Sequence, residues 1–71
     1  MKRVSTFAKR LKELREEKGL SLRGLSEEVE NISYASISDW ETKRYMPNVE
    51  AVIELAQFFE VTVGYLLGFE E

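Results

Sequence analysis

Apolar side chains recur at helical spacing in five stretches of this chain, and no stretch alternates polar and apolar residues as a half-buried strand would. Four of these stretches follow a residue whose side chain can accept a hydrogen bond from the first turn of a helix, namely Ser21, Ser33, Asn48 and Thr62. The expected helices are 5–18, 22–30, 33–43, 49–59 and 63–67. The sequence therefore predicts an all-α fold.

No covalent cross-link can hold this fold together. The 71 residues include no cysteine and no histidine, which excludes disulfides and the commonest metal ligands. A chain of this length forms one domain, 1–71, near the lower limit of what folds without such staples. We expect its stability to come from an apolar core made of Phe7, Leu11, Leu14, Leu22, Leu25, Val29, Ile37, Trp40, Val49, Val52, Ile53, Ala56, Phe59, Val63, Leu66 and Leu67.

Glycine and asparagine mark two of the expected turns. Gly19 follows the first helix, where a left-handed residue is common. Asn31 lies between the second and third helices, and asparagine tolerates the left-handed conformation that a tight turn needs. Gly24 is unexpected, because a glycine inside a helix costs about 1 kcal/mol relative to alanine. The sequence offers no reason for it.

Charge is distributed unevenly along the chain, whose net charge is −3. Residues 1–44 hold all ten Lys and Arg and eight acids, a net charge of +2. Residues 45–71 hold five acids and no cation, a net charge of −5. This asymmetry indicates an electrostatic partner for the basic part, although a solvated surface of mixed charge is the ordinary alternative.

The segment 21–43 has the pattern of a helix-turn-helix unit. Ser26 is a small residue midway along the first helix of the unit, which allows the second helix to cross closely. Ile32 provides an apolar side chain in the turn and Ile37 provides one in the second helix. An ordinary helical hairpin has the same pattern, so the pattern alone leaves both interpretations open.

The runs RLKELREEKGLSLRGLSEEV and ISYASISDWETKRYMPNVEAVIELAQFFEVTVGYLLG are similar to the lambda-repressor/Cro-like (XRE-type) helix-turn-helix family. The similarity covers 7–68, nearly the whole chain. It implies a compact five-helix domain that binds operator DNA as a homodimer, with the third helix in the major groove. The implied function is a sequence-specific transcriptional regulator, and we predict a repressor.

Carried over by position, the resemblance implies two sets of DNA contacts. The base-contacting residues would be Tyr34, Ala35, Ser38, Asp39 and Thr42 on the third helix. The phosphate-contacting residues would be Arg23, Lys43, Arg44 and Arg10, with the N-terminal Lys2 and Arg3 as further candidates. The alternative for each set is an ordinary solvent-facing surface.

The sequence departs from the family pattern in three places. Leu22 stands where relatives commonly have a glutamine that holds the DNA backbone, and Glu30-Asn31 replaces a single turn glycine. Asp39 places a carboxylate on the expected DNA-facing surface. It precedes Lys43 by four residues, the favourable order for a helical ion pair. Leu22, Asp39 and the net charge of −3 favour a second hypothesis, a protein-interaction module such as an antitoxin or adaptor that keeps the fold.

Arg15 and Glu41 are expected to form a partly buried ion pair that ties the first helix to the third, as in many relatives. Phe58, Tyr65 and Phe69 are expected to be exposed apolar anchors of the dimer, although they could instead complete the core.

The sequence gives little support to an enzyme. It has no glycine-rich phosphate loop and no carboxylates at metal-ligand spacing, so we expect no cofactor and no small-molecule substrate. No apolar run approaches 18 residues and the start is unlike a signal peptide, which predicts a cytoplasmic location without membrane contact.

Overall fold

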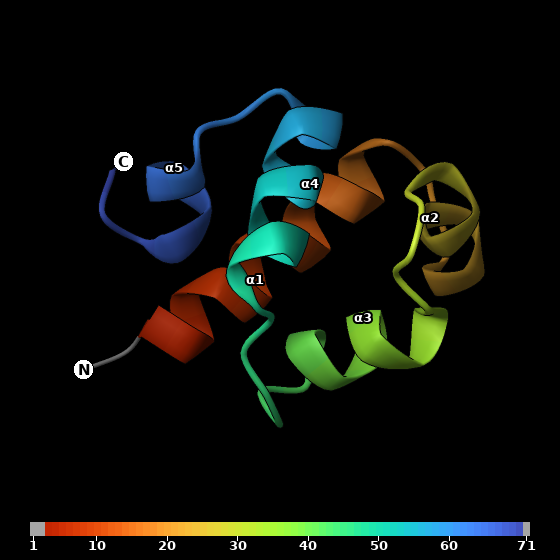
Figure 1. Cartoon of the computed structure of the whole chain (residues 1–71), viewed down its shortest axis with the longest axis horizontal. Helices are drawn as coiled ribbons and strands as arrows, with labels where there is room; N and C mark the ends of the chain where they lie inside the picture. The colour runs from red at the N-terminus through yellow and green to blue at the C-terminus, as the bar shows by residue number, and fades with distance from the viewer. Residues whose placement is uncertain (1–2, 71) are drawn as a thin grey trace.

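The computed structural model describes residues 3–70, with side chains from residue 6 onward. This part of the chain forms five α-helices and no strand: α1 (Arg3–Glu17), α2 (Leu22–Glu28), α3 (Tyr34–Glu41), α4 (Val49–Phe59) and α5 (Val63–Leu67). The helices α1 and α4 lie at the centre of the domain, while α5 and the C-terminal end occupy one side (Figure 1). The helices α2 and α3 lie on the opposite side, where α3 packs against α1 and α2. The all-α prediction is confirmed.

Side-chain caps begin the last four helices, as their sequences predict. Each capping oxygen accepts a hydrogen bond from a backbone N–H in the first turn: Ser21 from Gly24 at 2.9 Å, Ser33 from Ser36 at 3.1 Å, Asn48 from Ala51 at 2.8 Å and Thr62 from Tyr65 at 2.9 Å. These bonds satisfy donors that a helix leaves free at its start.

Gly24 now has a local explanation. A Cβ atom at this position would lie 3.2 Å from the Ser21 Oγ and 3.4 Å from the Leu20 Cδ2. A side chain there would therefore crowd the hydroxyl group that caps α2. The absence of a Cβ keeps this cap undisturbed.

All five helices contribute to the core, and much of it matches the expected set. Its buried apolar residues are Phe7, Leu11, Leu25, Val29, Ile32, Ile37, Trp40, Val52, Leu55, Ala56, Phe59 and Leu66, with Ala8 also buried. The ring of Phe7 meets that of Trp40 edge to face, with 6.4 Å between their centres. This contact joins α1 to α3 in the interior.

Three expected core residues lie at the surface instead. Val49 is 73% exposed, Ile53 is 41% exposed and Val63 is 36% exposed. Leu55, which the sequence-based prediction omits, is fully buried on α4. Val49 and Val63 are the first residues of their helices, where a side chain can extend beyond the packed part of the domain.

Both helices of the helix-turn-helix unit end earlier than predicted. The helix α2 ends at Glu28 rather than Glu30, and α3 ends at Glu41 rather than Lys43. Lys43 has a φ of 68°, and the N–H of Arg44 donates to the carbonyl of Asp39 at 2.9 Å, so the backbone turns out of the helix. In the other direction α1 begins at Arg3, two residues before the predicted start.

The link between α2 and α3 follows the predicted pattern. Asn31 has a φ of 66°, the left-handed conformation expected for it. Ile32 is buried, and its carbonyl accepts a hydrogen bond from the Ser26 Oγ at 2.8 Å. The hydroxyl of this small residue thus holds the link against α2 as well as allowing the two helices to approach.

Candidate nucleic-acid interface

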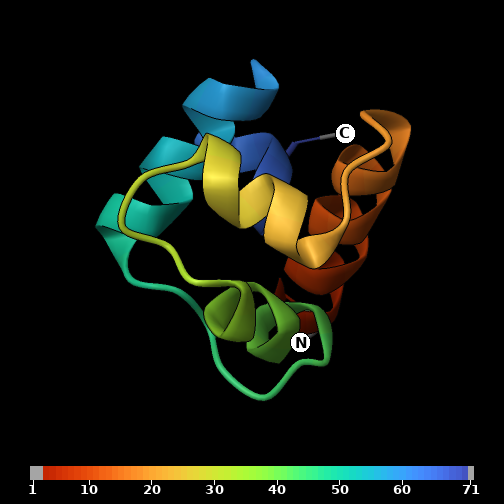
Figure 2. The same cartoon turned by 90° about the vertical axis from the view of Figure 1, so that its right-hand side faces the viewer.

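The outer face of α3 lies at one edge of the domain, away from α4 and α5 (Figure 2). Tyr34, Ala35 and Thr42 are exposed, and Ser38 and Asp39 are partly exposed. Ile37 and Trp40 face the core on the other side of the helix. The five residues predicted to contact bases therefore share one accessible face, which we call the α3 face.

Arg23 joins the α3 face from α2. Its guanidinium carbon lies 4.2 Å from the centre of the Tyr34 ring, within the range of a cation–π contact. Two residues predicted to contact DNA separately are therefore in contact with each other. Sequence spacing gives no signal of this pairing, because it depends on how α2 and α3 cross.

Asp39 has a different cationic neighbour from the one predicted. Its Oδ1 lies 4.0 Å from the Arg44 Nε; the Arg44 side chain is largely exposed and that of Asp39 partly exposed. The predicted pair with Lys43 is wrong, because Lys43 follows the end of α3 and its left-handed backbone departs from the helical spacing. An exposed pair at this distance contributes little to stability.

Thr42 uses its hydroxyl within the helix end. The Oγ1 donates toward the carbonyl of Ser38 at 2.8 Å, with the Asp39 carbonyl at 3.2 Å. Both carbonyls already accept a backbone hydrogen bond, Ser38 from the N–H of Thr42 and Asp39 from the N–H of Arg44, so the hydroxyl adds a second donor at the end of α3. The hydroxyl hydrogen of Thr42 is therefore used within the helix, while its oxygen can still accept a hydrogen bond.

Arg10 is partly buried and contacts α5 and the residues that follow it. These contacts favour a structural role for Arg10 over the predicted phosphate contact. Its Nη1 donates to the carbonyl of Tyr65 and to that of Glu70 at 2.6 Å. Its guanidinium carbon also lies 4.2 Å from the centre of the Tyr65 ring. Arg10 thus fastens the C-terminal end of the chain to α1. The other N-terminal candidates, Lys2 and the side chain of Arg3, lie outside the described residues.

Arg15 and Glu41 form a two-pronged ion pair between α1 and the end of α3. The Arg15 Nε and Nη2 donate to the two carboxylate oxygens of Glu41 at 2.7 and 2.9 Å. The Arg15 Nη1 donates to the carbonyl of Leu20 at 2.8 Å. The hydrogen bonds that Arg15 donates to Glu41 raise the pKa of Arg15 above its ordinary value, although partial burial opposes the rise. The pair fixes the tilt of α3 on the domain.

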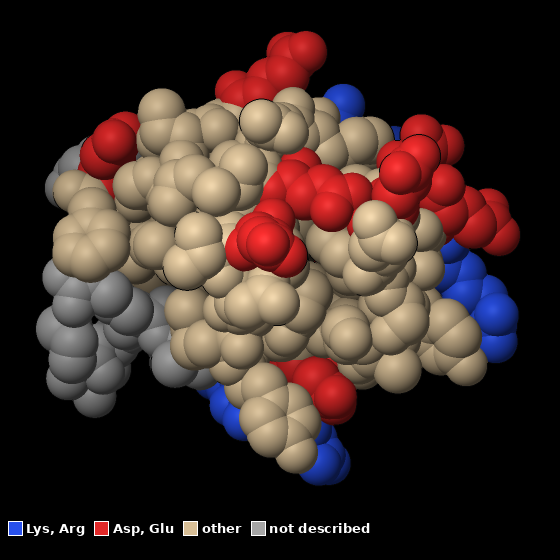
Figure 3. All heavy atoms as spheres, viewed as in Figure 1, with Lys and Arg blue, Asp and Glu red and all other residues tan. Residues whose placement is uncertain are grey.

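The α4 side of the domain is acidic, whereas the cations Arg23, Lys43 and Arg44 border the α3 face. Acidic side chains lie across the face shown in Figure 3, and Lys and Arg appear at its lower and right-hand edges. Glu50 and Glu54 belong to α4 and Glu60 ends it. The charge asymmetry along the sequence therefore also separates the two sides in space.

The three aromatic residues expected at a dimer surface differ in exposure. Phe58 and Tyr65 are partly buried and lie beneath cations, Lys18 at 5.3 Å and Arg10 at 4.2 Å from the ring centres. Phe69 is 63% exposed. Only Phe69 of this set presents a largely accessible ring.

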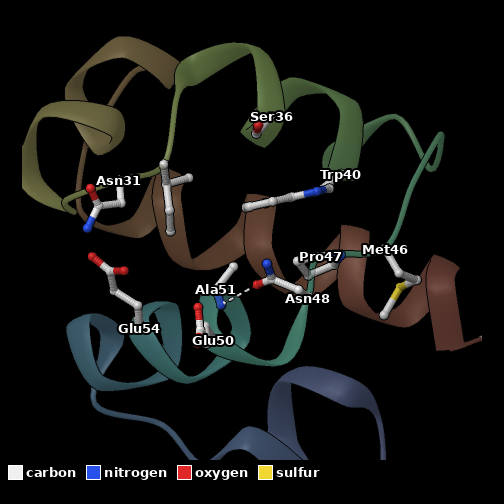
Figure 4. A pocket seen from close by; sticks show the side chains of 10 residues that line it. Asn31, Ser36, Trp40, Met46, Pro47, Asn48, Glu50, Ala51 and Glu54 are labelled. Atoms are coloured by element: carbon white, nitrogen blue, oxygen red, sulfur yellow. Dashed lines mark hydrogen bonds between the residues drawn. The ribbon is translucent and has the colours of Figure 1, made fainter.

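A pocket of about 350 Å³ lies between α3 and α4, with Trp40 and Ser36 on one side and Glu50 and Glu54 on the other (Figure 4).

Among residues 3–70, no group of three or more acidic side chains is placed to hold a metal ion. Within the same part of the chain, no helix is long and apolar enough to cross a membrane.

Comparison with known proteins identifies the fold family. A family model described as helix-turn-helix matches residues 11–66. This chain belongs to the XRE-type helix-turn-helix family. The helix-turn-helix domain is also similar to the HTH-type transcriptional activator BcrR of Enterococcus faecalis, with 37% identity over 65 residues. That alignment covers 92% of this chain and 31% of the relative, so the domain spans about a third of the length of BcrR.

Proposed function

We propose that this chain is a sequence-specific DNA-binding regulator of transcription that inserts α3 into the major groove. The observation that carries the proposal is the α3 face, an accessible polar helix surface bordered by Arg23, Lys43 and Arg44. Membership of the helix-turn-helix family supports it, as does the similarity to a protein named a transcriptional activator.

In this proposal the cations contact the DNA backbone and the α3 face contacts the bases. Arg23, Lys43 and Arg44 meet phosphates, which sets the position of the domain on the duplex without reading sequence. Ala35, Ser38 and Asp39 face base edges, where Ala35 can pack on a thymine methyl and Ser38 can donate or accept. Thr42 contributes its methyl group, because its hydroxyl donates to α3.

Selection of bound fragments from a random pool of duplex DNA, at two salt concentrations, tests this function. Enrichment of a defined site that persists at the higher salt supports sequence-specific binding, since non-specific phosphate binding falls steeply with salt. Recovery of no enriched sequence at either concentration contradicts the proposal.

We also propose that two copies bind one operator, because a single small domain offers few base contacts. Two-fold symmetry then predicts an inverted repeat with half-sites about 34–36 Å apart, or a multiple of that distance.

Whether the regulator represses or activates transcription, the sign of regulation, is a separate question. A repressor remains our prediction from the sequence, whereas the similar protein BcrR is named an activator. Placing the selected site upstream of, or over, a reporter promoter tests the sign directly.

The second candidate function is a protein-interaction module, an antitoxin or adaptor that keeps the fold. The acidic side formed by α4 favours it, together with Asp39 on the α3 face and Leu22 at the start of α2. A chain that selects no DNA sequence and instead forms a stable complex with a basic protein surface would establish this candidate.

A further inference from the structure

The contact between Arg23 and Tyr34 joins the two helices of the helix-turn-helix unit at its outer surface. Arg23 lies in the first turn of α2, and Tyr34 is the first residue of α3. The guanidinium carbon is 4.2 Å from the ring centre, and Tyr34 is 42% exposed. The ring is therefore accessible enough to touch DNA, yet it is already occupied by a cation from the neighbouring helix.

Arg23 stands at a place where the helix itself does not favour a cation. The first turn of a helix is the positive end of its macrodipole, and α2 has no acidic residue there. Glu27 follows Arg23 by one turn, but in the described part of the chain it forms no ion pair with Arg23. The Tyr34 ring is therefore the contact that holds the guanidinium beside α3.

A stacked guanidinium keeps its hydrogen-bonding edges open. Its N–H donors lie in its own plane, so a ring that covers one face leaves them free. Those edges match two oxygens of one phosphate. We propose that Tyr34 is a positioning residue whose ring, and not its hydroxyl, orders Arg23 for a two-pronged contact with a DNA phosphate. This inference rests on the proposed DNA binding and assigns Tyr34 a different role from the direct base contact predicted from the sequence.

The expected gain is modest and measurable. An arginine loses rotamer freedom when it binds a phosphate, and an arginine already held by a ring loses less. Because exposed cation–π contacts are weak, the ring should improve DNA affinity by about two- to five-fold. The gain should be the same on every sequence, because a phosphate contact does not distinguish bases.

The test is a double-mutant cycle on the full chain, with duplex DNA carrying the selected site and a scrambled duplex as probes. Tyr34→Phe keeps the ring and removes the hydroxyl, so we expect unchanged affinity for both duplexes. Tyr34→Leu should weaken both by about two- to five-fold. In an Arg23→Ala background, Tyr34→Leu should cause no further loss. Thermal unfolding of each variant controls for changes in the folded fraction.

A second measurement reads the contact without DNA. The ring current of Tyr34 should shift the NMR signal of the Arg23 side-chain Nε–H, and this shift should persist in Tyr34→Phe and vanish in Tyr34→Leu. A signal that does not differ between the two variants would show that the ring does not hold Arg23 in solution.

Three binding outcomes would overturn the inference. Equal losses for Tyr34→Phe and Tyr34→Leu would make the hydroxyl the functional group. An undiminished effect of Tyr34→Leu in the Arg23→Ala background would make Tyr34 independent of Arg23. A loss confined to one base pair of the selected site would make the contact a base contact. Failure of the unmodified chain to bind either duplex would instead contradict the proposed function, and the NMR measurement would still decide whether the ring holds Arg23.

Discussion

Arg15 and Glu41 meet through two parallel hydrogen bonds of 2.7 and 2.9 Å, with only 12% and 8% of their side chains exposed. The pair joins the last turn of α1 to the last residue of α3, the helix that carries the proposed DNA contacts. A salt bridge so well shielded is costly to break, because the remaining charge loses its partner without regaining full solvation.

The first prediction concerns this pair. Arg15→Ala should lower the free energy of unfolding by about 3 kcal/mol, since it leaves the Glu41 carboxylate and the Leu20 carbonyl without their donor. Replacing both partners, as Arg15→Met with Glu41→Leu, should cost much less because no charge is stranded. Urea unfolding of the three proteins measures both effects. Equal destabilisation by the single and double replacement would contradict this account.

The second prediction concerns pH. The folded state raises the pKa of Arg15, so the stability that this group provides is fully present below the unfolded pKa. It is lost only as the pH rises through the still higher folded value. The difference in unfolding free energy between the parent chain and Arg15→Ala should therefore be the same at pH about 7 and about 9. A difference that shrinks over this range would contradict the direction of the shift.

The third prediction concerns Lys43, whose φ of 68° is unfavourable for a residue with a side chain. Lys43→Gly should raise the stability of the fold by about 1 kcal/mol. The same change should weaken DNA binding on all sequences and reduce the log–log salt slope by about 0.9 if Lys43 meets a phosphate. Arg44→Ala is the matched control, because it should reduce the slope without the gain in stability. An unchanged slope in both variants would place these cations on a solvated surface.

The fourth prediction concerns Asp39. A carboxylate on the α3 face weakens general attraction to DNA, but it can accept a hydrogen bond from the N4 amino group of cytosine. Asp39→Asn should therefore strengthen binding to random DNA and reduce the preference for one C·G pair by about 1–3 kcal/mol. Arg44→Ala removes the ion pair while keeping the carboxylate, so it should retain that preference. If Asp39→Asn strengthens binding equally on every sequence, the carboxylate does not read a base.

The fifth prediction concerns assembly on DNA. Phe69→Ser should convert binding of two chains into independent binding of one chain per half-site, if the region after α5 forms the dimer contact. Val49→Ser is the matched control, since Val49 is also an exposed apolar residue but lies on another helix. Sedimentation of the complexes distinguishes one bound chain from two. Loss of the two-chain complex in the control alone would move the contact to α4.

Local chemistry explains which features the sequence predicts well. The capping roles of Ser21, Ser33, Asn48 and Thr62 are confirmed because each depends on residues within one turn. The left-handed Asn31 is confirmed for the same reason.

Other features depend on how helices meet, and sequence spacing gave no access to them. Ile53 shares α4 with four better-buried apolar residues, and only the packing of α4 decides which of them faces inward. The sequence predicts an end of α3 that is too late, because Lys43 adopts a left-handed conformation that its residue type does not suggest. The contact of Arg23 with Tyr34 arises between two helices and has no signature in either one.

Trp40 is the single tryptophan of the chain. It lies on the buried side of α3, with its ring against that of Phe7. Indole emission depends on contact with water, so its wavelength reports whether α3 remains seated on α1. The α3 face lies on the other side of the helix, so DNA bound there leaves the indole in the same surroundings. Intrinsic tryptophan fluorescence therefore distinguishes a variant that no longer binds DNA but remains folded from a variant that has unfolded.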